Sequence, residues 1–289
     1  MVFNPIKFND ALPYDGILRK VAQVLGKRNN FANQNYNFGA YLGEFCVTFG
    51  LAFLICINVI HGQTDTALKV GLYCAAMIYS MGIITGSNFN PGLSLAMWLA
   101  RPDLHTFMSV FSYWCSQMLG AFCGALVAWG ITGETIGIAP GTRPDGTVYG
   151  AGEAFLIEVI MTAFFHWVVL HVAFGHTDFP NDYFGLAIGF QIYVSVGTMV
   201  PVSGACLNPA LAVAFITTNV MNKGADGGGE WFPVYFFAGF VAALLSSTIF
   251  KLNRAKEFDD QYAKTYHKAD SAINGAISKE ISSADMLPK

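Results

Sequence analysis

Two Asn-Pro steps, 118 residues apart, constrain this chain more than any other feature of its sequence. They read Asn90-Pro91-Gly92 and Asn208-Pro209-Ala210. Asn is a favoured N-cap and Pro is favoured at the first helical position, so each step predicts the start of a helix. The apolar stretch that follows each step is short, covering residues 93–100 and 211–217. We therefore expect two half-length helices whose positive N-terminal ends are exposed.

The rest of the chain is too apolar and too poor in charge for an ordinary soluble domain. It is 54% hydrophobic and only 12% charged, whereas soluble domains carry roughly 25% charged residues. Apolar runs long enough to cross a hydrocarbon core of roughly 30 Å cover residues 38–60, 67–84, 105–131, 151–174, 183–201 and 231–250. The sequence thus predicts an all-α membrane protein with six transmembrane helices and two re-entrant half-helices.

The two halves of this apolar region repeat each other. Glu44 in the first run is matched 114 residues later by Glu158 in the fourth run. Each repeat, residues 38–131 and 151–250, contains three spans, so the second repeat must lie inverted across the membrane. The two half-helices then enter from opposite faces, and their N-termini meet near the middle. Because non-helical backbone persists at that depth only where it lines a cavity, the pattern predicts a polar path through the protein.

Polar segments flank the apolar region at both ends. We expect residues 37–250 to form a channel domain between an N-terminal arm, residues 1–36, and a C-terminal tail, residues 251–289. Thirteen of the 16 Lys and Arg residues fall in the arm, the tail or the connections on the same side of the membrane. Positively charged loops favour the cytoplasm, so both termini are predicted to be cytoplasmic.

The composition disfavours several classes of function. A net charge of −3 gives no reason to expect nucleic acid as a partner. The six cysteines lie in apolar stretches or beside the second Asn-Pro step, without C-x-x-C spacing, so we expect buried thiols rather than disulfide bonds or a metal site. Because the sequence shows no nucleophile-base pair and no metal cluster, we expect neither an enzyme nor a metal or organic cofactor.

The predicted meeting point of the two half-helices indicates how solutes would be sorted. Two positive helix ends repel cations there, and the same field opposes a proton that moves along a water wire. The side-chain amides of Asn90 and Asn208 can donate hydrogen bonds to an oxygen that passes between them. Cys206, two residues before Asn208, either faces this path as a pore thiol or packs behind the loop.

Along residues 38–250 the chain resembles the aquaporin, or major intrinsic protein, family. The resemblance rests on the two Asn-Pro steps, the paired glutamates, and Gln117 with the small residues Gly120, Ala121, Gly124 and Ala125. It implies an aquaporin-like fold and a passive channel for water or for small neutral solutes such as glycerol, urea, hydrogen peroxide and ammonia. It also implies a homotetramer in the lipid bilayer, with one pore in each subunit.

The resemblance assigns roles to single residues as well. Glu44 and Glu158 would hold the backbone of the re-entrant loops; the alternative is that these intramembrane acids carry protons. The outer constriction of the family, its selectivity filter, falls on four apolar residues, Val70, Val196, Ala205 and Leu211.

This filter departs from the family pattern. We call the triplets Asn90-Pro91-Gly92 and Asn208-Pro209-Ala210 the first and second box. Leu211 stands where the family usually has Arg after the second box, and the first box ends in Gly92 rather than Ala. We expect an outer filter that is apolar, wider than in a strict water channel and without a fixed positive charge. Alternatively, Phe89 or Tyr73 fills the gap and keeps the filter narrow. The position that holds Asp in the glycerol-conducting branch of the family is Ala212, which does not support a dedicated glycerol channel.

Two other functions stay open. An all-apolar filter is compatible with a structural or interaction membrane protein whose pore is closed, because apolar constrictions can block by dewetting. An ion channel is less favoured, because no ring of acids lines the predicted path. The loop at residues 175–182 could cap the pore, and serines in the tail could be phosphorylated. His166 and His171 are expected to be packed or capping residues rather than pH sensors.

Overall fold

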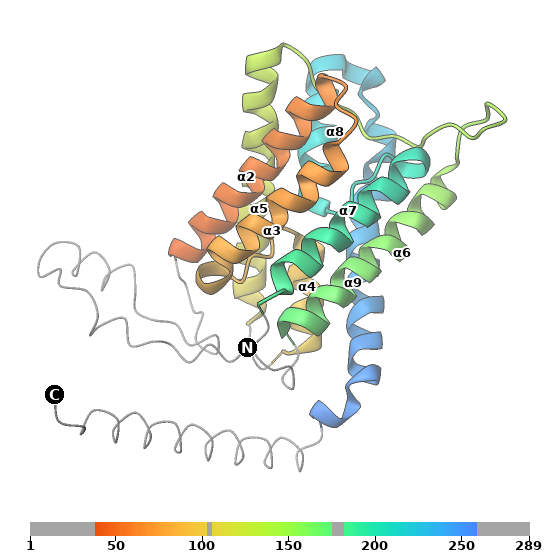
Figure 1. Ribbon diagram of the computed structural model, residues 1–289. Coiled ribbons are helices and arrows are strands. Elements are labelled where there is room, and N and C mark those ends of the chain that lie inside the picture. The colour runs from red at the N-terminus through yellow and green to blue at the C-terminus, as the bar shows by residue number, and fades with distance from the viewer. Residues whose placement is uncertain (1–37, 103–105, 175–181, 259–289) are drawn as a thin grey trace, which may run out of the picture.

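The computed structural model describes residues 38–102, 106–174 and 182–258, which form a helical bundle (Figure 1). The helices are α2 (Phe38–Ile60), α3 (Thr66–Thr85), α4 (Pro91–Ala100), α5 (Phe107–Thr132), α6 (Ala151–Val169), α7 (Phe184–Ser203), α8 (Pro209–Lys223) and α9 (Phe232–Asn253). Short turns are the π-helix η2 (Leu170–Phe174) and the 3-10 helices η3 (Gly224–Gly227), η4 (Gly229–Trp231) and η5 (Ala255–Phe258).

Each apolar run predicted to span the membrane forms a long helix. Five segments of the described chain are long and apolar enough to cross a membrane: α2, α5, α6 with η2, α7, and α9 with η4. The helix of the remaining run, α3, is 20 residues long. Each Asn-Pro step starts a shorter helix, α4 with 10 residues and α8 with 15. The observed fold is therefore the predicted all-α membrane fold.

The two half-helices point in opposite directions from the centre of the bundle. We call the end at which α2 begins and α9 ends the inner end, and the opposite end the outer end (Figure 1). Helix α4 runs from the centre toward the inner end, and α8 runs from the centre toward the outer end (Figure 1). This opposition is the arrangement that an inverted repeat requires.

Glycines allow the long helices to cross closely. A Cβ atom added at Gly120 or Gly124 of α5 would lie 2.3 Å from a backbone oxygen of α2. One added at Gly71 of α3 would lie 2.5 Å from the backbone oxygen of Gly189 on α7. Small residues at such crossings let helix backbones approach in lipid, so the small-residue row of α5 packs as the sequence predicts.

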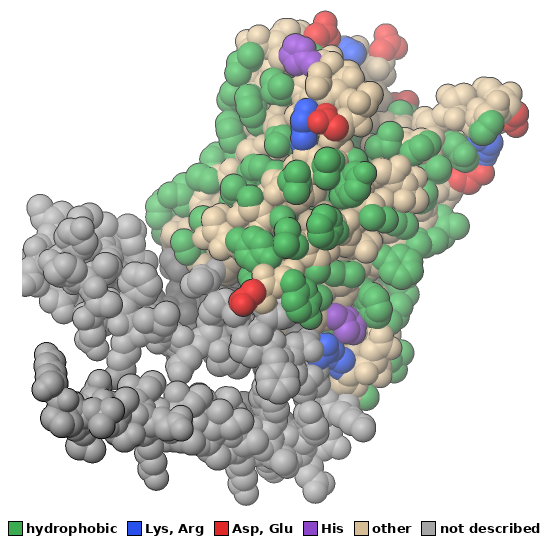
Figure 2. Space-filling model, viewed as in Figure 1, with side chains coloured by type: hydrophobic (Ala, Val, Ile, Leu, Met, Phe, Trp, Pro, Cys, Tyr) green, Lys and Arg blue, Asp and Glu red, His purple; other side chains and the backbone are tan. Residues whose placement is uncertain are grey.

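The flank of the bundle is apolar and its ends are polar. Figure 2 shows hydrophobic side chains over the visible flank, whereas the Lys, Arg, Asp and Glu side chains on this face gather toward the two ends and on a projecting loop. Large side chains such as Leu119, Phe190 and Leu244 are each 56% exposed. Exposure of this size over a whole belt fits a lipid environment.

Polar contacts fix the Gly-rich loop that follows α8. The Asn219 side chain accepts a hydrogen bond from the Thr135 hydroxyl (2.8 Å) and donates one to the backbone oxygen of Gly227 (2.9 Å). Asn222 donates to the same Thr135 hydroxyl at 3.1 Å. These bonds tie the loop at residues 224–229 to the loop between α5 and α6 at the outer end.

Helices α7 and α8 both end later than the sequence predicts. Helix α7 does not end at Pro201 but continues to Ser203, where Gly204 closes it in the left-handed region at φ 81°. Helix α8 continues past the apolar stretch to Lys223, and within it the buried Thr218 hydroxyl donates to the backbone oxygen of Ala214 at 2.8 Å.

Candidate functional site: two half-helix starts in a membrane-spanning cavity

Asn90 and Asn208 cap the two half-helices in the same way. Both residues are extended, with φ −149° and −150°, and a proline follows each of them at the first helical position. The Asn90 Oδ1 atom accepts hydrogen bonds from the backbone N–H groups of Gly92 (2.8 Å) and Leu93 (3.3 Å). The Asn208 Oδ1 atom accepts one from Ala210 at 2.9 Å. Each side-chain oxygen is therefore engaged by its own helix, which leaves the Nδ2 group as a donor.

The two caps are crossed with each other. Asn90 Nδ2 donates to the backbone oxygen of Leu207, and Asn208 Nδ2 donates to that of Phe89, both at 2.8 Å. An amide nitrogen carries two hydrogens, so each asparagine retains one more donor after this bond. Both asparagines line the central cavity, where that second hydrogen is available to a solute.

The loops before the two caps have an unusual backbone. Ser87 and Phe89 before the first cap, and Ala205 and Leu207 before the second, all have positive φ between 53° and 62°. Such conformations cost on the order of 1–3 kcal/mol for each non-glycine residue. The four strained residues occupy matching positions in the two halves, so the strained backbone is a common feature of the two loops.

Two buried glutamates hold these loops. Glu44 accepts hydrogen bonds from the backbone N–H groups of Asn88 (3.0 Å) and Phe89 (2.8 Å). Glu158 accepts two from Cys206 and Leu207, both at 2.8 Å. The Gln117 side chain donates a further bond to Glu44, and the Ser203 hydroxyl donates one to Glu158, each at 2.7 Å. The carboxylates thus satisfy backbone donors that the turned loops cannot pair themselves.

A cavity of about 930 Å³ runs past the two caps from one end of the bundle to the other. Its outer end lies at Gln63 and Thr64 in the loop between α2 and α3, and its inner end lies at Phe174 and Asp182. Among the described residues that line it, Asp182 is the one with a charged side chain. The remaining wall is mostly aliphatic and aromatic, so hydrogen-bonding groups are concentrated at the boxes.

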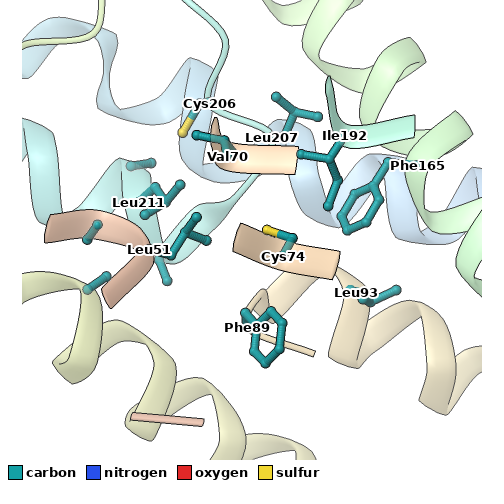
Figure 3. Packing of buried hydrophobic residues seen from close by; sticks show 14 of the residues in the cluster. Leu51, Val70, Cys74, Phe89, Leu93, Phe165, Ile192, Cys206, Leu207 and Leu211 are labelled. Atoms are coloured by element: carbon teal, nitrogen blue, oxygen red, sulfur yellow. The ribbon is translucent and has the colours of Figure 1, made fainter. Parts of the chain in front are cut away.

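All four residues predicted for the outer filter line this cavity. Val70 and Leu211 are each 5% exposed, and Val196 and Ala205 are half-buried. Figure 3 shows Val70, Leu211 and Leu51 with their side chains directed toward a shared space. These four side chains are all apolar.

The two aromatic residues that could fill the gap in the outer filter have different places in the structure. Tyr73 does not line the cavity; its hydroxyl donates to the backbone oxygen of Val47 at 2.9 Å and packs over Gly50. Phe89 does line it and is 4% exposed.

Sequence reasoning missed a set of aromatic residues in the wall. They lie between the boxes and the inner end, and they are Tyr79, Phe165, Phe174 and Phe184. The repeat contained the signal for two of them. Phe165 lies 114 residues after Leu51 and Phe184 lies 114 residues after Val70, and all four residues line the cavity.

Gly92 is a steric requirement of the first box. A Cβ atom at this position would lie 2.7 Å from the backbone oxygen of Gly239 on α9 and 3.1 Å from the His166 ring on α6. Gly239 itself would place a Cβ atom 2.8 Å from the Pro209 ring. The backbone of α9 at Gly239 therefore packs directly against both boxes. His166 is fully buried, as expected for a packed side chain. The residue at the matching position of the first half is the much smaller Ala52.

Cys206 combines the two positions expected for it. The residue lines the cavity and is 2% exposed, while its thiol donates to the backbone oxygen of Asn208 at 3.3 Å. In residues 38–102, 106–174 and 182–258, no group of three or more His, Cys, Asp or Glu side chains is placed to hold a metal ion.

Known proteins resemble this chain in sequence and in fold. Residues 37–250 match the family described as major intrinsic protein. Aquaporin NIP2-2 of Zea mays is 28% identical over 227 residues, covering 75% of this chain and 71% of that protein. Glycerol uptake facilitator protein-like 6 of Lactiplantibacillus plantarum is 28% identical over 219 residues, covering 72% and 94%. The X-ray structure of the aquaglyceroporin from Plasmodium falciparum has the same fold, with a TM-score of 0.62, 20% identity, and coverage of 73% and 93%. Because the family match spans most of its length, this chain belongs to the major intrinsic protein family.

Proposed function

We propose that this protein is a passive membrane channel for water and small neutral solutes such as glycerol, urea, hydrogen peroxide or ammonia. The observation that carries the proposal is a cavity that reaches both ends of the bundle and passes two crossed asparagine amides at its middle. The names of the relatives, an aquaporin and a glycerol uptake facilitator, support the same class of solute.

The boxes exclude ions by two physical effects. The N-termini of α4 and α8 both face the middle of the cavity, and their positive ends raise the energy of a cation there. Asn90 and Asn208 each offer an N–H donor to a passing oxygen, so a water molecule between them is oriented as an acceptor from both. That orientation breaks a chain of waters that could relay a proton.

Val70, Val196, Ala205 and Leu211 form the outer filter in this proposal. Their side chains offer no hydrogen bond, so a solute gives up part of its hydration over this section without replacement. Since Leu211 stands where a positive charge is usual, rejection of cations rests on the boxes. The apolar section accommodates weakly hydrated neutral solutes better than ions.

We assign Glu44 and Glu158 a structural role rather than proton transport. Each carboxylate accepts two backbone hydrogen bonds and one from a side chain within its own half of the protein. A carboxylate that released these bonds to carry a proton would leave buried N–H groups unpaired.

The proposed assembly is a homotetramer with both termini in the cytoplasm, so that the inner end is the cytoplasmic end. The Lys and Arg distribution supports this orientation, and the apolar flank supplies surface for packing between subunits. The proposed arm and nearly all of the tail, together with the candidate capping residues 175–181, lie outside the described residues.

Flux into proteoliposomes tests the proposal. We expect stopped-flow light scattering to show faster water, urea or glycerol equilibration with the protein than in empty liposomes. If every solute equilibrates at the empty-liposome rate, the structural or interaction protein with a closed pore becomes the better description.

The Leu211→Arg variant tests the outer filter, with Leu211→Met as the matched apolar control. We expect Arg to reduce the flux of glycerol and urea while water flux is kept or raised, because it adds bulk and donors. The Met control should resemble the wild type. Unchanged glycerol and urea flux in the Arg variant would remove Leu211 from the filter.

A further inference from the structure

We infer that the section of the pore that sorts solutes by size lies between the boxes and the inner end, and that Phe165 and Phe184 form it. This inference rests on the proposed channel function and adds the location of its selectivity. The outer filter then acts as a wide apolar entrance, and discrimination between small and larger neutral solutes takes place beyond the boxes.

The repeat provides the first argument. The first and second helices of each half are related by 114 residues, so Leu51 corresponds to Phe165 and Val70 corresponds to Phe184. All four line the cavity, two on each side of the boxes. At these two wall positions the outer half carries aliphatic side chains and the inner half carries bulkier aromatic rings. At a third pair, Val196 of the outer half corresponds to the smaller Gly82 of the inner half. The narrowing is therefore expected at the two rings themselves.

The placement of Phe165 provides the second argument. It is 6% exposed and lies in the cavity wall. Figure 3 shows its ring beside Ile192, at the side of the open space where Leu93 also lies. Phe165 of α6 and Ile192 of α7 thus lie side by side in the cavity wall, and Leu93 of α4 lies farther along the same side.

The support of Phe184 provides the third argument. Its ring packs edge-to-face against Tyr79, with ring centroids 5.2 Å apart. The Tyr79 hydroxyl donates to the backbone oxygen of Asp182 at 2.8 Å and accepts from the backbone N–H of Leu186 at 3.2 Å. Phe184 therefore stands in a braced position at the start of α7. The two hydrogen bonds fix Tyr79, and the Phe184 ring would lose its contact with Tyr79 if it turned away, so the packed ring can define the opening.

The inner section is also not wholly apolar. Ser87 lines it, and its counterpart in the outer filter, 118 residues later, is Ala205. The Ser87 hydroxyl donates to the backbone oxygen of Met77 at 3.2 Å, so its oxygen can accept from a solute donor. A solute that passes between the aromatic rings and this hydroxyl finds one apolar side and one polar side, whereas the four side chains of the outer filter are all apolar.

Relative fluxes of differently sized solutes test the location. Phe165→Leu and Phe184→Leu should raise the glycerol-to-water and urea-to-water flux ratios several-fold, because each shortens a side chain at the proposed constriction. The matched outer variants, Leu51→Ala and Val70→Ala, should change these ratios little. The opposite pattern, with ratios that respond to the outer variants alone, would overturn the inference while leaving the channel function intact.

Discussion

The two half-helix starts have one backbone design and two different surroundings. Phe89 and Leu207 share the left-handed conformation, with φ 53° and 56°, and a buried carboxylate pairs the N–H group of each. Beyond that the halves differ. Around the first box, Ser94 accepts from both Asn88 and Gln117 and donates to the backbone oxygen of Asn90, each at 3.1 Å.

The corresponding shell of the second box contains almost no polar side chains. Cys206 stands in place of Asn88, and Ala212 stands in place of Ser94. Helix α9 approaches the boxes through Gly239 rather than through a side chain. The comparison separates what the geometry requires, a cap, a carboxylate and a turned loop, from what can vary, which is how the space behind the loop is filled.

Removing either carboxylate charge should produce the largest effect, and the two effects should be similar. In Glu44→Gln and Glu158→Gln, one carboxylate oxygen is replaced by an amide NH₂ group. This group points at a backbone N–H, so two donors face each other and the buried N–H has no acceptor. We expect a loss of about 3 kcal/mol in the free energy of unfolding for each variant, with loss of flux. Thermal unfolding in detergent, with the exposed Glu134→Gln as control, measures this.

A difference of more than about 2 kcal/mol between the two variants would show that one half holds its loop by other means. A fully stable Glu158→Gln protein would remove the structural role assigned to that residue.

Exchanging the third residues of the boxes should give unequal effects. Gly92→Ala makes the first box read like the second, yet we expect it to destabilise by about 1–3 kcal/mol through overpacking against Gly239. The reverse change, Ala210→Gly, should cost about 0.5–1 kcal/mol because it adds backbone freedom in the unfolded chain. Unfolding midpoints of the pair measure the contrast. A neutral or stabilising Gly92→Ala would mean that α9 moves away easily.

Ser94→Ala tests the polar shell that only the first box has. The change leaves Asn88 and Gln117 without their shared acceptor, so we expect a loss of about 1–2 kcal/mol. Ser80→Ala is the matched control, because Ser80 is exposed and bonds only within its helix at Met77. Equal unfolding midpoints for both variants would show that the shell does not contribute to stability.

The smallest effect is expected outside both boxes, at the outer end. The Lys69 ammonium group, 2.8 Å from the Asp65 carboxylate, holds the pKa of Asp65 below its usual value of 3.8. A lowered folded-state pKa means that the pair stabilises the protein above about pH 4 and that this contribution is lost as the pH falls through the lowered pKa. Because Asp65 is fully exposed, screening keeps the contribution small.

Asp65→Asn should therefore barely change the unfolding midpoint at pH 7, and its difference from the wild type should vanish at pH 2. A midpoint that drops as far as in Ser94→Ala would show that the outer end contributes more than the exposed pair suggests.

The sequence predicts the parts of this site that depend on local chemistry or on the repeat. Asn90 and Asn208 cap their helices as their residue types and the following prolines indicate. The six long helices follow from apolar runs, and the small residues of α5 lie where α2 crosses. These features are encoded in neighbouring residues, so a single chain is enough to read them.

Contacts between distant segments could not be predicted in this way. The reason for Gly92 lies in Gly239, a residue of another helix, and no local pattern joins them. The repeat relates Phe165 to Leu51, but neither residue carries a local sequence signal that would mark it as part of the cavity wall. Helix α7 likewise continues through Pro201 to Ser203, although a proline inside a helix removes one of its hydrogen bonds.

The crossed amide bonds also affect how the chain can be made. Asn90 Nδ2 finds its acceptor on Leu207, a residue that leaves the ribosome long after the first three spans have been synthesised. Until then the first half carries a strained loop, an unpaired amide and an open wall toward α7. We therefore expect the first half to be inserted early but to acquire its final structure late, when the second half docks, so that chains truncated before residue 207 remain substrates for membrane quality control.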